Sequence, residues 1–447
     1  MATLIQNAII ANEGIEFKGS VLLEGEIITD IFNSNIPESV LTSAEIINAE
    51  GLYLIPGVID DQVHFREPGL THKADIYTES RAAVAGGVTT FMEMPNTSPQ
   101  TTTQKLLEEK YKLGAEKSLA NYSFYIGATN DNLDELLQTD IKNVCGIKIF
   151  MGASTGNMLV DNHDTLENIF KKSRLLIATH CEDENIVREN TQAYINKYGE
   201  DIPVKYHPYI RSEDACYKSS SFAVSLAKKY DTRLHVLHVS TGRELELFDN
   251  TMQLKDKRIT SEICVHHLWF DESDYEKLGN LIKWNPAVKT QNDKNALFEG
   301  LLSNKLDVIA TDHAPHTLEE KSRTYSKAPS GGPLVQHALT TMMEFKHQGK
   351  ISLSQIVNKM CHSPAIAFNI SKRGYIRKNY YADLVLVDPA KQWTINKENI
   401  LYKCGWSPLE NTVMHSKVIS TFINGRRIYH NGEFTEQYKG NALRFDR

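Results

Sequence analysis

Long apolar runs, clustered cysteines and an excess of basic residues are all missing from this sequence of 447 residues. No apolar run reaches the roughly 18–20 residues that a membrane span needs. The N-terminus has no basic segment followed by a long apolar core, which predicts that there is no secretory signal. The net charge of −7 argues against the basic surface that nucleic-acid-binding proteins carry. We therefore expect neither a membrane nor a nucleic-acid partner.

The six cysteines are scattered and show no Cys-x-x-Cys spacing. In a chain of this size such a pattern is typical of reduced thiols rather than of a disulfide framework, and it favours the cytoplasm. Histidine, by contrast, is frequent, with 16 residues. Because imidazole is the most common metal ligand among side chains, their positions are the first place to look for a metal site.

Short β-rich apolar segments alternate with helical ones through the middle of the chain. The predicted strands are 57–64, 88–94, 122–127, 146–150, 175–180, 233–238, 259–265 and 307–312. Predicted helices between or after them include 102–118, 214–229 and 332–348. Eight strands that alternate with helices indicate a parallel sheet and are the number that a (β/α)8 barrel (a TIM barrel) requires. A doubly wound open sheet is the alternative.

The two ends of the chain differ from the middle. Both hold short alternating segments, such as "YYADLVLVDP" near the C-terminus, and an Asn-Gly turn at Asn424-Gly425 typical of a hairpin. We predict that residues 1–55 and 371–447 form one small β-sandwich domain, and that residues 56–370 form the barrel.

Polar residues end one predicted strand after another. They are His64, Asn96, Lys148, His180, His238 and Asp312. In a barrel the C-terminal strand ends converge on the active site. His180 and His238 can bind zinc through ring nitrogens, and Asp312 can do so through one oxygen. Buried Lys148 has two interpretations, an ion pair with Asp312 or Glu182, or a carbamate formed with CO2 that bridges two metal ions.

The first of these strands, "GVIDDQVHFREPG", has Gln62-Val63-His64 where zinc hydrolases usually have His-x-His. Strand alternation predicts that Gln62 and His64 share one face and that Asp61 lies on the other, so that Asp61 does not replace the missing imidazole. The same rule predicts that His235 and His238 face opposite sides, and we expect His238 to face the site.

The motifs "PGVIDDQVHFREPG", "MEMPNT", "IKIFMG", "ATHCED", "LHVLHVST", "WNPAVKT" and "ATDHAPH" occur in an order that resembles the cyclic amidohydrolases. The resemblance covers about residues 50–390, and within the family the dihydroorotase branch is the most similar. It implies a metal-dependent (β/α)8 barrel that opens or closes a cyclic amide, with dihydroorotate and N-carbamoyl-aspartate as the small-molecule substrates. It also makes a homodimer a reasonable expectation.

The resemblance implies a role for each strand-end residue. His64 and Asp312 would bind a first zinc ion, His180 and His238 a second, and carboxylated Lys148 would bridge them. Asp312 would also act as general base and then as general acid. We expect one or two zinc ions per chain.

Substrate contacts follow from the same resemblance, because dihydroorotate carries a ring carboxylate that calls for arginine and amide donors. The predicted substrate-binding residues are Arg66, Asn96, Asn285, His316 and the backbone at Ser330 and Gly331. For Arg66 the alternative is a structural salt bridge to Glu67 or Glu79, and for Asn96 it is a turn-forming role after Pro95.

Other functions compete with this prediction. Allantoinase and dihydropyrimidinase share the metals and the reaction, but their substrates have no carboxylate for Arg66 to bind. A non-catalytic scaffold homologue with eroded ligands is less consistent with the sequence, because only Gln62 supports it. We predict instead that Gln62 or water completes the first metal's shell, since an amide oxygen is a weaker zinc ligand than imidazole, and that this ion is held less tightly than the second.

Overall fold

The computed structural model describes residues 2–152 and 158–447, and its central feature is a closed barrel of parallel strands. The barrel strands are β6 (Val58–Val63), β7 (Val88–Glu93), β8 (Asn121–Phe124) with β9 (Ile126–Gly127), β10 (Ile147–Phe150), β11 (Ile177–His180), β12 (Leu234–Val236), β13 (Ile259–Cys264) and β14 (Val308–Ala310). A parallel bridge between Val63 and His313 joins β14 back to β6. All eight predicted strands are present, and the open-sheet alternative is wrong.

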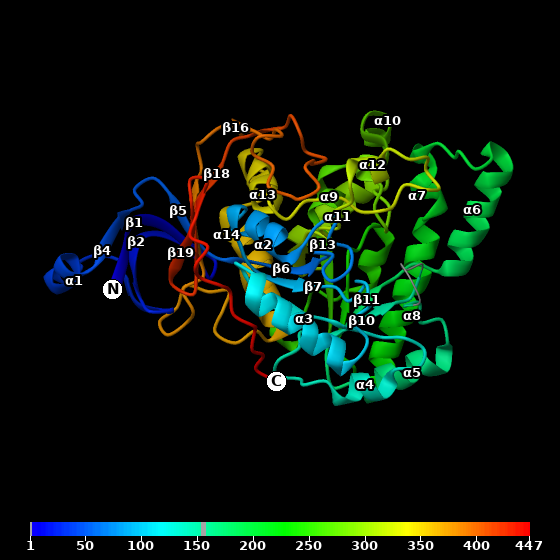
Figure 1. Cartoon of the computed structure of the whole chain (residues 1–447), viewed down its shortest axis with the longest axis horizontal. Helices are drawn as coiled ribbons and strands as arrows, with labels where there is room; N and C mark the ends of the chain where they lie inside the picture. The colour runs from blue at the N-terminus through cyan, green and yellow to red at the C-terminus, as the bar shows by residue number, and fades with distance from the viewer. Residues whose placement is uncertain (1, 153–157) are drawn as a thin grey trace.

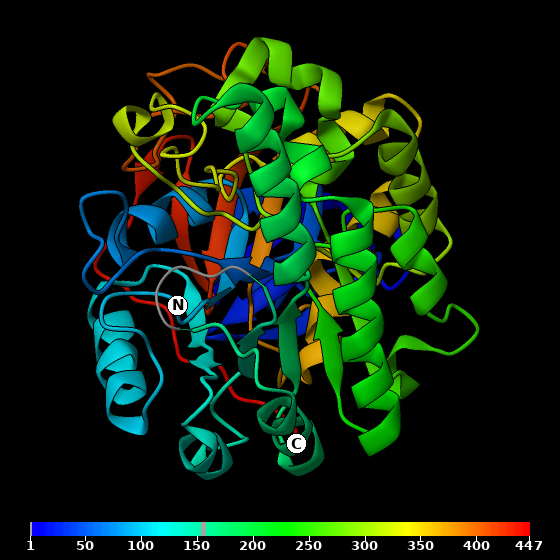
Figure 2. The same cartoon turned by 90° about the vertical axis from the view of Figure 1, so that its right-hand side faces the viewer.

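Helices follow the strands and surround the barrel, as Figures 1 and 2 show. The longer ones are α2 (Ile76–Ala85), α3 (Gln104–Lys117), α5 (His163–Lys172), α6 (Glu184–Tyr198), α8 (Glu213–Tyr230), α11 (Gln291–Leu302) and α13 (Ala338–His347). Short polar side chains begin several of them, for example Ser212, whose hydroxyl accepts a hydrogen bond from the Ala215 N–H. The predicted helix 332–348 begins six residues late, because Gly332 pairs with His313 in a β-bridge. Among the described residues no helix is both long and apolar enough to cross a membrane.

Strands from both ends of the chain form a β-domain on one side of the barrel, and it lies behind the barrel in Figure 2. They are β1 (Ala2–Asn12), β2 (Ile15–Glu24), β3 (Ile27–Phe32), β4 (Glu45–Asn48), β5 (Tyr53–Pro56), β15 (Leu384–Asp388), β18 (Lys417–Ile423), β19 (Arg426–His430) and β20 (Glu433–Phe434). All nine belong to one continuous sheet, in which β5 pairs with β1 on one side and with β15 on the other. A separate apolar core that includes Ile10, Leu54 and Leu384 fills this domain. The boundaries proposed above at residues 55 and 370 stay a prediction.

Apolar side chains fill much of the lower part of the barrel interior. Met92, Tyr125, Ala178 and Val308 pack there against Phe368 of α15 (Ser363–Phe368), which covers the N-terminal end of the barrel. The interior therefore offers polar groups mainly toward the C-terminal ends of the strands, where barrel enzymes place their chemistry.

Candidate active site

A cavity of about 260 Å³ opens at the C-terminal ends of the barrel strands. Every residue predicted to bind metal or substrate lines it: Gln62, His64, Arg66, Asn96, Lys148, His180, His238, Asn285, Asp312, His316, Ser330 and Gly331. Residues that are up to 269 positions apart in the chain thus meet in one place. The individual roles assigned to them above stay predictions.

One half of the cavity rim comes from β11 and β12 and carries His180 and His238. His180 Nδ1 lies 3.0 Å from His238 Nε2. Two ligands of one tetrahedral zinc ion lie about 3.3 Å apart, given bonds of about 2.0–2.1 Å, so the facing nitrogens are spaced as a ligand pair. Burial lowers the pKa of both rings, which keeps them neutral and able to bind a metal at neutral pH.

A carboxylate faces the other ring nitrogen of His180. His180 Nε2 lies 3.0 Å from Glu182 Oε2, and Arg211 forms an ion pair with the same oxygen. Burial by itself would raise the pKa of Glu182, but Arg211 and His180 together lower it to about 2. A carboxylate behind a metal-binding histidine fixes the ring and raises its basicity. His180 is therefore pre-oriented for a ligand role.

The opposite half of the rim comes from β6 and β14. His64 Nδ1 lies 2.8 Å from Asn96 Oδ1, and His64 Nε2 lies 3.1 Å from Asp312 Oδ1. The Gln62 amide nitrogen donates to the same Asp312 oxygen at 3.1 Å. The Gln62 amide oxygen faces the Cys264 thiol, 3.9 Å away. In this arrangement Gln62 holds Asp312 and does not direct its oxygen toward the cavity centre.

Lys148 of β10 is fully buried between the two halves. Burial lowers the pKa of its amine to about 8, and Asp312 and Glu262 offset only part of that effect. No carboxylate of the described residues lies within 4.0 Å of its Nζ, which is 4.6 Å from the centre of the Phe150 ring. Neither ion pair considered for Lys148 is formed, since Glu182 binds Arg211 instead. A buried, partly neutral amine is the form that reacts with CO2.

Arg66 lines the cavity and is 5% exposed. Its Nε donates to the Pro315 carbonyl at 3.2 Å, and within the described chain no carboxylate lies within 4.0 Å of its guanidinium. The alternative salt bridges are absent, because Glu67 pairs with Lys117 and Glu79 pairs with His313. The cavity thus contains a buried cation without a counterion.

His316 and the loop after it line the cavity next to Arg66. Lys73 has only donors, so the His316 Nδ1 at 3.0 Å must accept, and the His316 Nε2–H donates to the Ser330 carbonyl at 3.0 Å. Arg66 Nη2 lies 3.1 Å from that protonated nitrogen and gains no acceptor there. The N–H of Gly331 already donates to the Lys283 carbonyl, so it is committed to the fold.

Asn285 adds an unused acceptor to the cavity, because its buried Oδ1 has no hydrogen-bond partner among residues that the structure describes. Five further residues line the cavity that were not predicted as site residues: Phe150, Arg211, Trp284, Ala314 and Pro329. Trp284 and Phe150 lie inside the motifs "WNPAVKT" and "IKIFMG", so those motifs pointed to them. Arg211 follows a short helix outside any motif, and only its position beside Glu182 reveals it.

The prediction that alternate side chains lie on opposite faces of a strand is wrong at two strands. β6 pairs with β7 irregularly between Asp60 and Val63, so Asp61 points into the barrel interior instead of away from it. β12 ends at Val236, and His238 has a φ of 38°, so His235 and His238 both lie inside the barrel. Odd and even positions face opposite sides of a strand only where the strand is regular.

Comparison with known proteins decides the family, since the model of the Amidohydrolase family matches residues 53–428. The chain belongs to the amidohydrolase family. Curated relatives include the dihydroorotase of Methanosphaera stadtmanae, 32% identical over 412 residues with 92% of each chain covered. The dihydroorotase of Pyrococcus abyssi is 32% identical over 395 residues, 88% of each chain. The resemblance drawn from the motifs is confirmed.

Solved amidohydrolase structures share the whole fold. The L-hydantoinase (dihydropyrimidinase) from Arthrobacter aurescens matches with a TM-score of 0.92 at 24% identity, over 99% of each chain. Dihydropyrimidinase from Brevibacillus agri matches with a TM-score of 0.87 at 25% identity, over the full length of both chains. The predicted fold class, a (β/α)8 barrel with a small β-domain built from both ends, is confirmed.

Proposed function

We propose that this amidohydrolase is a zinc-dependent dihydroorotase, which catalyses the reversible cyclisation of N-carbamoyl-L-aspartate to dihydroorotate in pyrimidine biosynthesis. The coarser conclusion, hydrolysis of a cyclic amide, is supported by the names of its relatives, which are dihydroorotases and hydantoinases. The choice of dihydroorotate needs an argument from the cavity itself.

One observation carries that choice, the buried guanidinium of Arg66 without a carboxylate partner. An uncompensated buried cation is costly, so the cavity favours a ligand that brings a negative charge. The ring carboxylate of dihydroorotate supplies one and can bind the guanidinium in a bidentate way. Hydantoins, dihydropyrimidines and allantoin carry no carboxylate on the ring and would leave Arg66 unpaired.

The donor set fits the metal ions that the family implies. His180 and His238 would hold one ion, and His64 and Asp312 the other, with Lys148 between them as a carbamate. When bound, such ions lower the pKa of water to around 7 and polarise the carbonyl that is attacked. This fit depends on one observation. His180 Nδ1 and His238 Nε2 face each other 3.0 Å apart, and both side chains are buried.

The side chains divide the remaining work. In ring opening, water attacks the ring carbonyl carbon, the carbon–nitrogen bond breaks and the nitrogen takes up a proton. Asp312 would receive the proton of the attacking water and pass it to that nitrogen, as general base and then general acid. Gln62, which donates to Oδ1 of Asp312, would fix the direction of this carboxylate. The free Oδ1 of Asn285 can accept a ring N–H.

Dihydropyrimidinase is the second candidate, because the solved structures above are of that type. At 24–25% identity this likeness speaks for the shared fold and not for the substrate. A dimeric state and a cytoplasmic location are further expectations that accompany the proposal.

The test is an assay of the purified protein with dihydroorotate, hydantoin, dihydrouracil and allantoin, together with zinc analysis. We expect zinc near one or two per chain and turnover of dihydroorotate alone. Turnover of hydantoin or dihydrouracil at a similar kcat/KM would instead favour the second candidate. A protein that holds zinc and turns over none of these substrates would support the scaffold alternative.

A further inference from the structure

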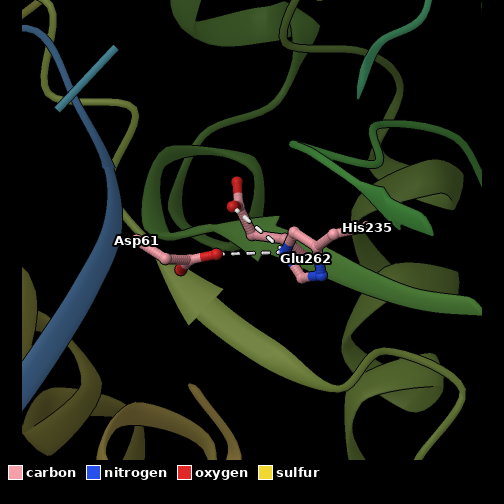
Figure 3. Close-up of side chains that lie close together, drawn as sticks. All are labelled: Asp61, His235 and Glu262. Atoms are coloured by element: carbon pink, nitrogen blue, oxygen red, sulfur yellow. Dashed lines mark ion pairs between the residues drawn. The ribbon is translucent and has the colours of Figure 1, made fainter. Parts of the chain in front are cut away.

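Three ionisable side chains meet inside the barrel below the cavity, and none of them lines it. They are Asp61 of β6, His235 of β12 and Glu262 of β13, and all three are completely buried. Figure 3 shows them pointing toward one another from separate strands. His235 Nε2 lies 3.0 Å from Asp61 Oδ2 and 3.6 Å from Glu262 Oε2. We call this group the sub-cavity cluster.

The orientation of the His235 ring is fixed by its other nitrogen. Nδ1 lies 2.7 Å from the hydroxyl oxygen of Thr260, and that hydroxyl donates its hydrogen to the Leu234 carbonyl. The hydroxyl therefore accepts from Nδ1–H. Nε2 is thereby directed at the two carboxylates, and the ring links β6 to β13.

Glu262 connects the sub-cavity cluster to the rim above it. Its Oε1 accepts the backbone N–H of His238 at 3.0 Å. His238 lies beyond the end of β12 and has a φ of 38°, a left-handed backbone conformation that residues other than glycine adopt rarely. A side-chain carboxylate here replaces the partner that a regular strand would find in its neighbour's backbone. This conformation is the one that brings His238 Nε2 to His180.

Asp61 connects the sub-cavity cluster to the opposite half of the rim. It directly precedes Gln62, within the irregular part of β6. Its two carboxylate oxygens have no hydrogen-bond partner in the described parts of the chain. The His235 ring faces them, with Nε2 3.0 Å from Oδ2. The position of the Gln62 backbone therefore depends on the same ring as the position of His238.

We propose that Asp61, His235 and Glu262 are positioning residues that hold His238, and through it the tighter metal ion, in register with Gln62 across the barrel. The proposal rests on the proposed function for the ligand role of His238. It adds to that function a set of groups beneath the cavity that touch neither substrate nor metal. Glu262 is the member whose contact with the site is direct, so it is the one to test.

The experiment compares Glu262→Gln, Glu262→Leu and a matched control, Glu93→Leu. Glu93 of β7 is also a completely buried carboxylate, but it pairs with Lys110 and does not line the cavity. Glu262→Gln keeps an oxygen that can accept the His238 N–H, whereas Glu262→Leu removes it. The readouts are zinc affinity by competition with a chelator, zinc per chain, kcat and KM for dihydroorotate, and thermal unfolding of the metal-free protein.

We expect Glu262→Leu to weaken the tighter zinc site about 10–100-fold, the range found for residues that orient metal ligands. Glu262→Gln should recover most of that affinity. Glu93→Leu should lower thermal stability as much as Glu262→Leu and leave zinc affinity unchanged. In active protein the loss should fall on kcat more than on KM, because Glu262 does not line the cavity in which Arg66 would bind the substrate.

Three outcomes would overturn the proposal. Glu262→Leu with the zinc affinity of the unmodified protein would show that the contact does not matter, and an equal loss in Glu93→Leu would reduce the effect to stability. A zinc ion that survives His180→Ala/His238→Ala and disappears in His235→Gln would show that the sub-cavity cluster binds a metal itself. Zinc affinity is measured without substrate, so a failure of the dihydroorotase assignment alone leaves this test intact.

Discussion

The two halves of the cavity rim are built differently although they face the same space. On the β11–β12 half, ring nitrogens of His180 and His238 face each other; Glu182 faces the other ring nitrogen of His180, and Glu262 accepts the backbone N–H of His238. On the β6–β14 half, Gln62 and His64 both contact the same oxygen of Asp312. Under the proposed function, the first half would hold an ion. The second is arranged around a carboxylate that can accept and release a proton.

This difference suggests a division of labour between binding and catalysis, and substitutions can test it. The largest expected effect comes from Asp312→Asn, which should lower kcat for dihydroorotate about 10²–10⁴-fold, the usual contribution of general acid–base catalysis. Steady-state kinetics and zinc analysis of the same sample measure it. The zinc held by the β11–β12 half should stay bound. Activity within tenfold of the unmodified protein would place the proton transfer elsewhere.

A pair of substitutions separates the two ions. His180→Ala should weaken the tighter zinc ion by more than about 100-fold, because the loss of a group behind a ligand already costs about 10–100-fold. His64→Ala should leave that ion in place and weaken only the other. Chelator titrations followed by metal analysis distinguish the two. The comparison between the halves fails if both variants lose the same ion.

The substrate end of the cavity predicts a smaller effect. Arg66→Met should raise KM for dihydroorotate about 10–100-fold, since a hydrogen bond to a charged group contributes about 1.5–3 kcal/mol. Hydantoin has no carboxylate, so any weak hydantoin turnover should not respond to the substitution. An unchanged KM for dihydroorotate would refute the role of Arg66 and with it the choice of substrate.

Gln62→His should reduce the asymmetry between the halves. Gln62 directs no oxygen toward the cavity centre, so an imidazole in its place would add a ligand that zinc prefers, and the weaker ion should bind about tenfold more tightly. Gentle chelation of the unmodified protein should remove one zinc before the other, and the variant should release both over a narrower range. If both ions already leave together in the unmodified protein, the halves are equal in affinity and our account of Gln62 is wrong.

Lys148 predicts the smallest change, and it depends on pH. Burial lowers its pKa to about 8, and only the neutral amine reacts with CO2, so carbamate formation should rise as pH increases through 8. Between pH 7 and pH 9 the neutral fraction grows from about 10% to about 90%. Carbon-13 NMR of the metal-free protein at constant dissolved ¹³CO2 measures this. A flat profile would mean that the lysine is already neutral or already paired.

Much of this site could be predicted from the sequence because each strand-end residue obeys a local rule. His64, His180 and Asp312 lie at or just beyond the C-terminal ends of their strands, and parallel strands in a barrel bring such positions together. The position of Asp61 could not be predicted, since it depends on an irregular pairing of β6 that leaves no mark in the residue pattern. Arg211 was hidden for another reason, because it reaches Glu182 from a loop outside any recognised motif.

The way in which the β-domain combines both ends of the chain has a consequence for how the protein is made. β5 pairs with β15, and more than 320 residues separate Pro56 from Leu384. A ribosome adds about 5–20 residues per second, so β5 must wait roughly 15 to 65 seconds for its partner. During that interval the edge of β5 and the apolar residues around Leu54 have no cover from the C-terminal strands. While the barrel is being synthesised, the emerging chain therefore exposes an unpaired strand edge that other chains can bind. Molecular chaperones protect nascent chains against such contacts.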